Sequence, residues 1–118
     1  MSPPQELRER TKKFAIRIVR LFQALPKSVE AQVMGKQLLR CGTSVAANYR
    51  AVCRARSKAE FVARMGIVAE EADESVLWLE LLEETSILRH ERLEDILNEA
   101  KELVAIFSTS LKTAKDNK

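Results

Sequence analysis

Apolar residues recur at steps of three and four along almost the whole chain, and this period constrains the fold more than any other feature. Such spacing places side chains on one face of an α-helix. Pro26 ends the first apolar stretch, and Ser57 with Glu60 has the form of a capping box at the start of another. We predict helices over residues 4–25, 28–56, 57–84 and 91–114. Because their connections are short, the predicted fold is all-α, a single antiparallel up-down-up-down four-helix bundle over residues 1–118.

The apolar seam predicted for residues 28–56 continues in phase through Gly42 and contains one polar side chain, that of Asn48. An asparagine inside such a seam lowers stability but fixes the register of the helices and their oligomeric state. It needs a hydrogen-bond partner there, such as a carboxylate or an arginine from a neighbouring helix. We therefore expect Asn48 to fix register, with ligand binding as the alternative.

Basic residues are concentrated in the first half of the chain. Residues 1–56 contain 12 Lys/Arg and 3 Asp/Glu, whereas residues 57–118 contain 8 and 14. This asymmetry indicates either an acidic partner for the first half or pairing between the two halves.

Eight of these cations lie on two helix faces. The face on residues 4–25 carries Arg10, Lys13, Arg17 and Arg20, and the outer face of residues 28–56 carries Lys36, Arg40, Arg50 and Arg54. Aligned cations of this kind follow the phosphates of a nucleic acid. The alternative is pairing with the acidic run of residues 70–74, within or between subunits. We expect this of Arg50 and Arg54, whereas residues 4–25 have fewer acids within reach. No aromatic residue interleaves with the eight positions, so we expect no stacking on single-stranded bases.

Residues 76–82 are apolar on nearly every side of a helix. Leu79 and Leu82 fill the inner face, which leaves Leu77, Trp78 and Leu81 directed elsewhere. A soluble monomer rarely leaves such a patch in water, and tryptophan is a favoured interface anchor, so we predict a subunit interface here. The alternative is that this helix is the most central one of the bundle.

The sequence contains no pattern of a catalytic or metal site. Its one histidine, His90, falls in a predicted connection, whereas bundles that hold two metal ions need Glu-x-x-His twice. The carboxylates of residues 70–74 are accompanied by neither a nucleophile nor a Gly-rich phosphate loop. We therefore expect no enzyme activity, no metal and no cofactor.

The two cysteines indicate a reducing compartment. Cys41 and Cys53 fall in one predicted helix, ~18 Å apart, which is too far for a disulfide. We expect a cytoplasmic location. No window of about 18 apolar residues predicts a membrane span, and the polar first residues do not resemble a secretion signal.

Three stretches carry a resemblance to a known family: GKQLLRCGTSVAANYR at residues 35–50, RARSKAEF at 54–61, and EEADE with WLELL at 70–74 and 78–82. They resemble the 23S rRNA intervening-sequence proteins, also called the four-helix-bundle S23 family. The resemblance implies a four-helix bundle that assembles as a ring-shaped homopentamer. Some members are encoded within inserts of the large ribosomal RNA gene, and a related basic pentamer of diversity-generating retroelements engages nucleic acid. Binding or assembly, rather than catalysis, is what the resemblance implies.

Together these observations predict a non-enzymatic homo-oligomer, a pentamer by the resemblance, that binds structured RNA or DNA through the two basic faces. The alternative is a structural or protein-interaction module whose ring docks a protein partner. A small-molecule sensor is a third hypothesis and rests on Asn48 alone. Salt separates the first two, because phosphate binding weakens as salt rises and an apolar protein contact does not.

Overall fold

Serine side chains begin three of the four helices. The computed structural model describes residues 1–117, which form α1 (Pro3–Gln23), α2 (Val29–Cys53), α3 (Lys58–Glu84) and α4 (His90–Asp116). Ser2, Ser28 and Ser57 are the N-caps of the first three, and each accepts a hydrogen bond from a backbone N–H of the first turn. The all-α prediction is confirmed, and residues 1–117 contain no strand.

Two helices end earlier than predicted, each for a local reason. α2 ends at Cys53 instead of residue 56, because Ser57 takes the extended backbone of an N-cap (φ −152°, ψ 163°). α1 ends at Gln23 instead of residue 25, since Pro26 disfavours helical backbone at the residue before it.

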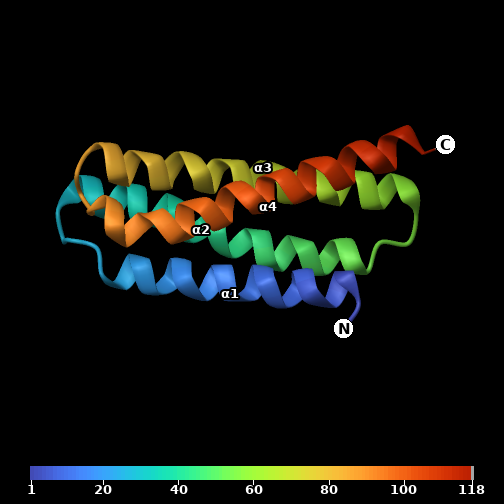
Figure 1. The fold of residues 1–118 in the computed structure, drawn as a ribbon, viewed down its shortest axis with the longest axis horizontal. Helices are drawn as coiled ribbons and strands as arrows, with labels where there is room; N and C mark the ends of the chain where they lie inside the picture. Colours follow the sequence, from blue (N-terminus) through green and yellow to red (C-terminus); the bar gives the residue numbers. More distant parts are fainter. Residues whose placement is uncertain (118) are drawn as a thin grey trace.

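Consecutive helices run antiparallel and lie side by side in the order α1, α2, α3, α4 (Figure 1). α2 packs against α1 and α3, and α3 packs against α4, whereas α1 and α4 touch over only a short stretch. The up-down-up-down prediction is confirmed. The α1–α2 and α3–α4 connections lie at one end of the 48 Å long molecule, which we call the two-loop end. The α2–α3 connection lies at the other, which we call the α2–α3 end (Figure 1).

The inner faces of all four helices form one apolar core. Among its fully buried side chains are Phe14 and Ile18, Leu38 and Val45, Val68 and Leu79, Leu103 and Phe107. Every helix contributes to this set, so the core runs along the length of the bundle.

One seam position in α2 was predicted wrongly. Tyr49, which is 4% exposed, fills the position expected for Asn48, and Asn48 is only half-buried. The reason lies in two glycines on the same helix face, Gly35 and Gly42, which precede Tyr49 at intervals of one heptad. A Cβ at Gly42 would lie 2.8 Å from Ile18 Cγ1, so α1 lies directly against this face. α2 therefore buries a wider face than its apolar residues indicate, and that face is rotated toward α1.

A tight turn ends α3 at the two-loop end. The backbone N–H of Ile87 donates to the Leu82 carbonyl oxygen at 3.1 Å, and that of Ser86 donates to the Glu83 carbonyl oxygen at 3.0 Å. This pair of bonds is the Schellman motif. Ser86 has a φ of 60°, the left-handed backbone for which this motif usually uses glycine.

Candidate nucleic-acid interface

Arg10, on the predicted basic face of α1, is neutralised by α4. Its guanidinium donates two hydrogen bonds of 2.7 Å to Glu99 and approaches Glu102 at 3.3 Å. The hydrogen bond to Glu99 raises the pKa of Arg10. We expected few acids within reach of α1, and for Arg10 this was wrong, because antiparallel α4 places its middle turns beside the start of α1.

The other three cations of this face are exposed and remain free. Within residues 1–117, Lys13, Arg17 and Arg20 form no ion pair. Arg17 and Arg20 border a hollow of about 250 Å³ between α1 and α4, together with Leu21, Arg92 and Ile96. Arg92 was not predicted, because its sequence neighbourhood is acidic and only the antiparallel packing brings it beside Arg20.

Arg40 of α2 forms ion pairs with the acidic run of α3. The Arg40 guanidinium donates to Glu71 at 3.3 Å and to Glu74, and Glu74 also accepts the indole N–H of Trp78 at 3.0 Å. We had expected Arg50 and Arg54 to pair with this run within or between subunits, and within the one chain they do not. Residues 71–74 lie level with the middle of α2, and Arg50 lies ten residues farther on, or ~15 Å along the helix.

Lys36, Arg50 and Arg54 are therefore exposed cations without an ion pair in the described chain. Arg54 also borders a hollow of about 410 Å³ at the α2–α3 end, with the side chains of Ala51, Arg56, Glu60 and Arg64. Basic charge at this end is thus denser than the predicted face of α2 indicated.

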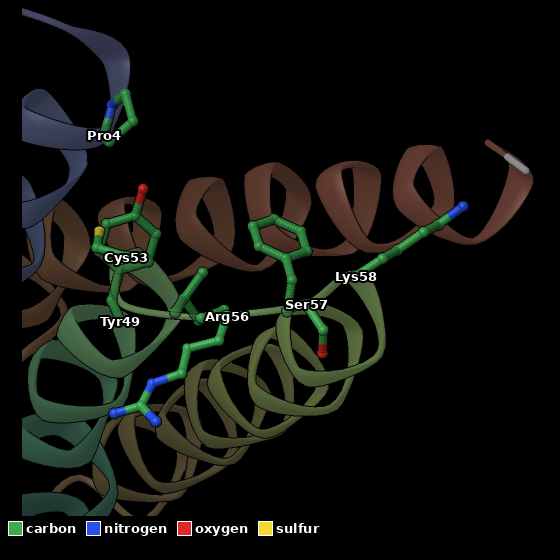
Figure 2. A pocket seen from close by; sticks show the side chains of 9 residues that line it. Pro4, Tyr49, Cys53, Arg56, Ser57 and Lys58 are labelled. Atoms are coloured by element: carbon green, nitrogen blue, oxygen red, sulfur yellow. The ribbon is translucent and has the colours of Figure 1, made fainter.

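A second and larger hollow, of about 530 Å³, adjoins this one and is shown in Figure 2. It is lined by Pro4, Tyr49, Val52, Cys53, Ala55, Arg56, Ser57, Lys58 and Phe61. Aromatic and basic side chains therefore meet here, although no aromatic residue interleaves with the eight predicted cations. Spacing within one helix did not reveal this, because the residues come from the start of α1, the end of α2 and the start of α3.

The predicted interface residues on α3 differ in exposure. Leu77 is 48% exposed, whereas Trp78 and Leu81 are half-buried. Trp78 packs against the core and is held by Glu74, so much of its surface is already covered within one chain. Val33 of α2, which we did not predict, is 56% exposed. Their role in self-association stays a prediction.

The polar residues proposed for other roles have local partners. The Asn48 amide donates to the Ser44 carbonyl oxygen at 3.0 Å, which is a bond within α2 and does not fix the register of α2 against another helix of the same chain. Cys41 is buried, and burial raises the pKa of its thiol, whereas Cys53 is exposed. Both cysteines are free. Among residues 1–117, no group of three or more His, Cys, Asp or Glu is placed to hold a metal ion.

No helix in the described part of the chain is both long enough and apolar enough to cross a membrane.

The family model described as 23S rRNA-intervening sequence protein matches residues 5–109. Among solved structures, the chain is similar to a protein of unknown function from the S23 ribosomal protein family of Bacteroides thetaiotaomicron VPI-5482. The two share 37% sequence identity with a TM-score of 0.83, over 90% of this chain and 98% of that chain. No curated protein matches. The family match spans nearly all of α1 to α4, and the chain belongs to the 23S rRNA-intervening sequence protein family.

Proposed function

We propose that this protein is a non-enzymatic helical bundle, assembled from several copies, that binds structured RNA or another nucleic acid through exposed cations of α1 and α2. The observation that carries the proposal is the freedom of Arg50 and Arg54. Within one chain, Glu71 and Glu74 of the acidic run expected to neutralise them are engaged by Arg40 instead. Free aligned cations favour a polyanionic partner, because each phosphate contact releases condensed counterions.

Arg10 and Arg40 are the weakest of the eight candidates for phosphate contact. Each is bound to two carboxylates, so contact with a phosphate would first require those ion pairs to break. The proposed contacts are therefore Lys13, Arg17 and Arg20 on α1 and Lys36, Arg50 and Arg54 on α2.

Self-association is the second part of the proposal, and exposed aliphatic side chains near the two-loop end favour it. Arg40 lies level with Glu71 and Glu74, so residues seven positions earlier in α2 lie level with residues 78–81 of α3. This register places Val33 near the predicted interface of Leu77, Trp78 and Leu81. A patch of large aliphatic side chains on a small protein favours burial against another copy. The resemblance suggests five copies. A ring that docks a protein partner through this patch is the alternative function.

The nucleic-acid proposal is tested by measuring the affinity of the purified protein for a structured ribosomal RNA fragment, and for length-matched duplex DNA, across a salt series. We expect the logarithm of the affinity to fall linearly with the logarithm of the salt concentration. Arg50→Glu with Arg54→Glu should weaken binding about tenfold or more and flatten this dependence by about two phosphate contacts.

The matched control reverses Lys27 and Lys101, two exposed cations outside both basic faces, to Glu. It changes the net charge equally and should have a much smaller effect. An equal loss in both variants would mean that only net charge matters, and absence of binding at low salt would refute the nucleic-acid proposal.

A further inference from the structure

The 530 Å³ hollow at the α2–α3 end combines an apolar wall with a basic rim (Figure 2). Val52 is buried and Phe61 is half-buried, so the phenyl ring of Phe61 keeps part of its surface accessible. The volume lies within the range of about 300–1,000 Å³ that is usual for small-molecule sites. Such a wall suits a flat apolar group of moderate size.

Tyr49 adds a fixed hydrogen-bond donor to this wall. Burial raises the pKa of Tyr49 to about 12. The hydroxyl therefore stays protonated at neutral pH. The ring packs on Phe107 of α4 with its centroid at 5.6 Å, which holds it in place.

Two cations flank the hollow. Arg56 and Lys58 extend to opposite sides of the α2–α3 connection (Figure 2), and neither forms an ion pair within residues 1–117. Glu60, which lines the adjoining hollow, accepts hydrogen bonds from the Arg56 backbone N–H at 3.2 Å and from Arg64 Nε at 3.1 Å. These two bonds lower the pKa of Glu60, so it stays ionised and bound to its own partners.

We propose that this hollow binds one nucleotide whose base is unpaired. The base lies against Phe61, within reach of the Tyr49 hydroxyl, and its phosphate lies on Arg56. Arg56 also lines the adjoining hollow, so the next phosphate of a strand reaches Arg54 there. Proteins read unpaired bases in this way, by stacking them on aromatic rings beside a basic track. The inference rests on the proposed nucleic-acid function and locates its recognition of single-stranded segments.

The test compares an RNA hairpin that has an unpaired loop with the same stem closed as a blunt duplex. Affinity is measured by fluorescence anisotropy at one salt concentration. We expect the full-length protein to prefer the hairpin. Phe61→Leu should lower the ratio of hairpin to duplex affinity about tenfold, because it removes a stacking surface. Arg56→Ala with Lys58→Ala should lower hairpin affinity by a similar factor, and these two exposed side chains are not part of the core.

Matched variants separate this effect from loss of stability. Phe22→Leu shortens another half-buried phenylalanine, near the two-loop end, and should leave the affinity ratio unchanged. Circular dichroism should show native helicity in both phenylalanine variants. Calorimetric titration with AMP and with UMP distinguishes the source of the nucleotide. Saturable binding of either one that Phe61→Leu abolishes supports a free mononucleotide as the ligand, and binding of the loop alone supports a strand.

The outcomes separate the two proposals. If both RNAs bind but Phe61→Leu and Phe22→Leu change the ratio equally, the nucleotide site is refuted and the nucleic-acid function stands. If the ratio is already one for the unmodified protein and neither mononucleotide binds, the site is likewise refuted. If no RNA and no mononucleotide binds at low salt, both proposals fall together.

Discussion

The two ends of the bundle expose opposite kinds of chemistry on the same pair of helices. Toward the two-loop end, Val33 of α2 and Leu77 of α3 are 56% and 48% exposed. At the α2–α3 end, the exposed side chains include the free cations Arg54 and Arg56. Between the two ends, Arg40 ties α2 to the carboxylates of α3.

The comparison shows that helix register, rather than composition, decides which cations are available. Arg50 and Arg54 of α2 lie beyond the acidic run of residues 70–74. Glu60 of α3 lines the same hollow as Arg54, but it is bound to Arg64 and to the Arg56 backbone. The acids of residues 70–74 are concentrated in the middle of α3, so they neutralise Arg40 and leave Arg50 and Arg54 free. Free cations of α2 therefore extend to the α2–α3 end, whereas the exposed aliphatic side chains of Val33 and Leu77 lie toward the two-loop end.

The largest expected effect is the loss of the proposed oligomer when charge enters the apolar patch of Val33 and Leu77. Val33→Glu with Leu77→Glu should convert the assembly to 13.4 kDa monomers, because unpaired carboxylates cannot be buried in an apolar contact. Light scattering measures the mass. Ile16→Glu with Val19→Glu, which alters two exposed apolar residues of α1, is the control and should leave the mass unchanged. An unaltered mass in the first variant would show that Val33 and Leu77 are not part of a subunit interface.

Two single substitutions on α1 should distinguish a cation that is ion-paired, Arg10, from one that is free, Arg17. Arg10→Gln should destabilise the protein by about 1 kcal/mol, since it leaves Glu99 without its partner, and about a third of the Arg10 side chain is exposed, which limits the loss through solvent screening. Its effect on RNA affinity should be small. Arg17→Gln should do the reverse, with severalfold weaker RNA binding and unchanged stability. Urea unfolding and anisotropy together measure this, and equal effects in both variants would contradict the distinction.

A glycine in place of Ser86, in the α3–α4 turn at the two-loop end, should stabilise the protein. Ser86 holds a φ of 60°, which costs a residue with a Cβ about 1 kcal/mol, so Ser86→Gly should raise the free energy of unfolding by up to this amount. Ser108→Gly, at an exposed position inside α4, should lower it by about half as much. Thermal unfolding followed by circular dichroism compares the two. A loss of stability in Ser86→Gly would mean that the Ser86 side chain stabilises the turn.

The sequence predicted the helices well because each carries a periodic apolar face, and three of them begin at a serine N-cap. The inner face of α3 is an example, since Leu79 and Leu82 are both buried as predicted. The prediction that Asn48 lies in the buried seam of α2 failed because the apolar pattern does not include glycine. Gly35 and Gly42 nevertheless mark the face on which α1 lies closest. Apolar periodicity reveals where large apolar side chains lie. Here the closest helix packing occurs at glycines, which have no side chain, so the periodicity does not reveal it.

The candidate site was less predictable, because its residues are joined by tertiary packing. Spacing within α2 correctly placed Arg50 and Arg54 on an exposed face, but it carried no information on which acids of α3 stand opposite them. The hollow that contains Tyr49 and Phe61 is formed where α2 ends and α3 begins, and it also needs Pro4 from the start of the chain. A sequence pattern confined to one helix cannot reveal such a site.

The smallest expected effect concerns pH, and it too belongs to the two-loop end. His90 Nδ1 lies 2.6 Å from a carboxylate oxygen of Glu83, and this hydrogen bond, with the charges of Glu83, Glu94 and Glu91, raises the pKa of His90. A raised pKa in the folded state means that the stabilisation is fully present below the unfolded pKa of about 6.5 and is lost as pH rises through the folded pKa. The melting temperature should therefore fall slightly more between pH 6 and 8 in the unmodified protein than in His90→Gln. Glu83→Gln should flatten the dependence in the same way, because it removes the same partner. If all three proteins give the same pH dependence, this contact does not contribute to the stability of the two-loop end, and the difference between the ends rests on their exposed surfaces alone.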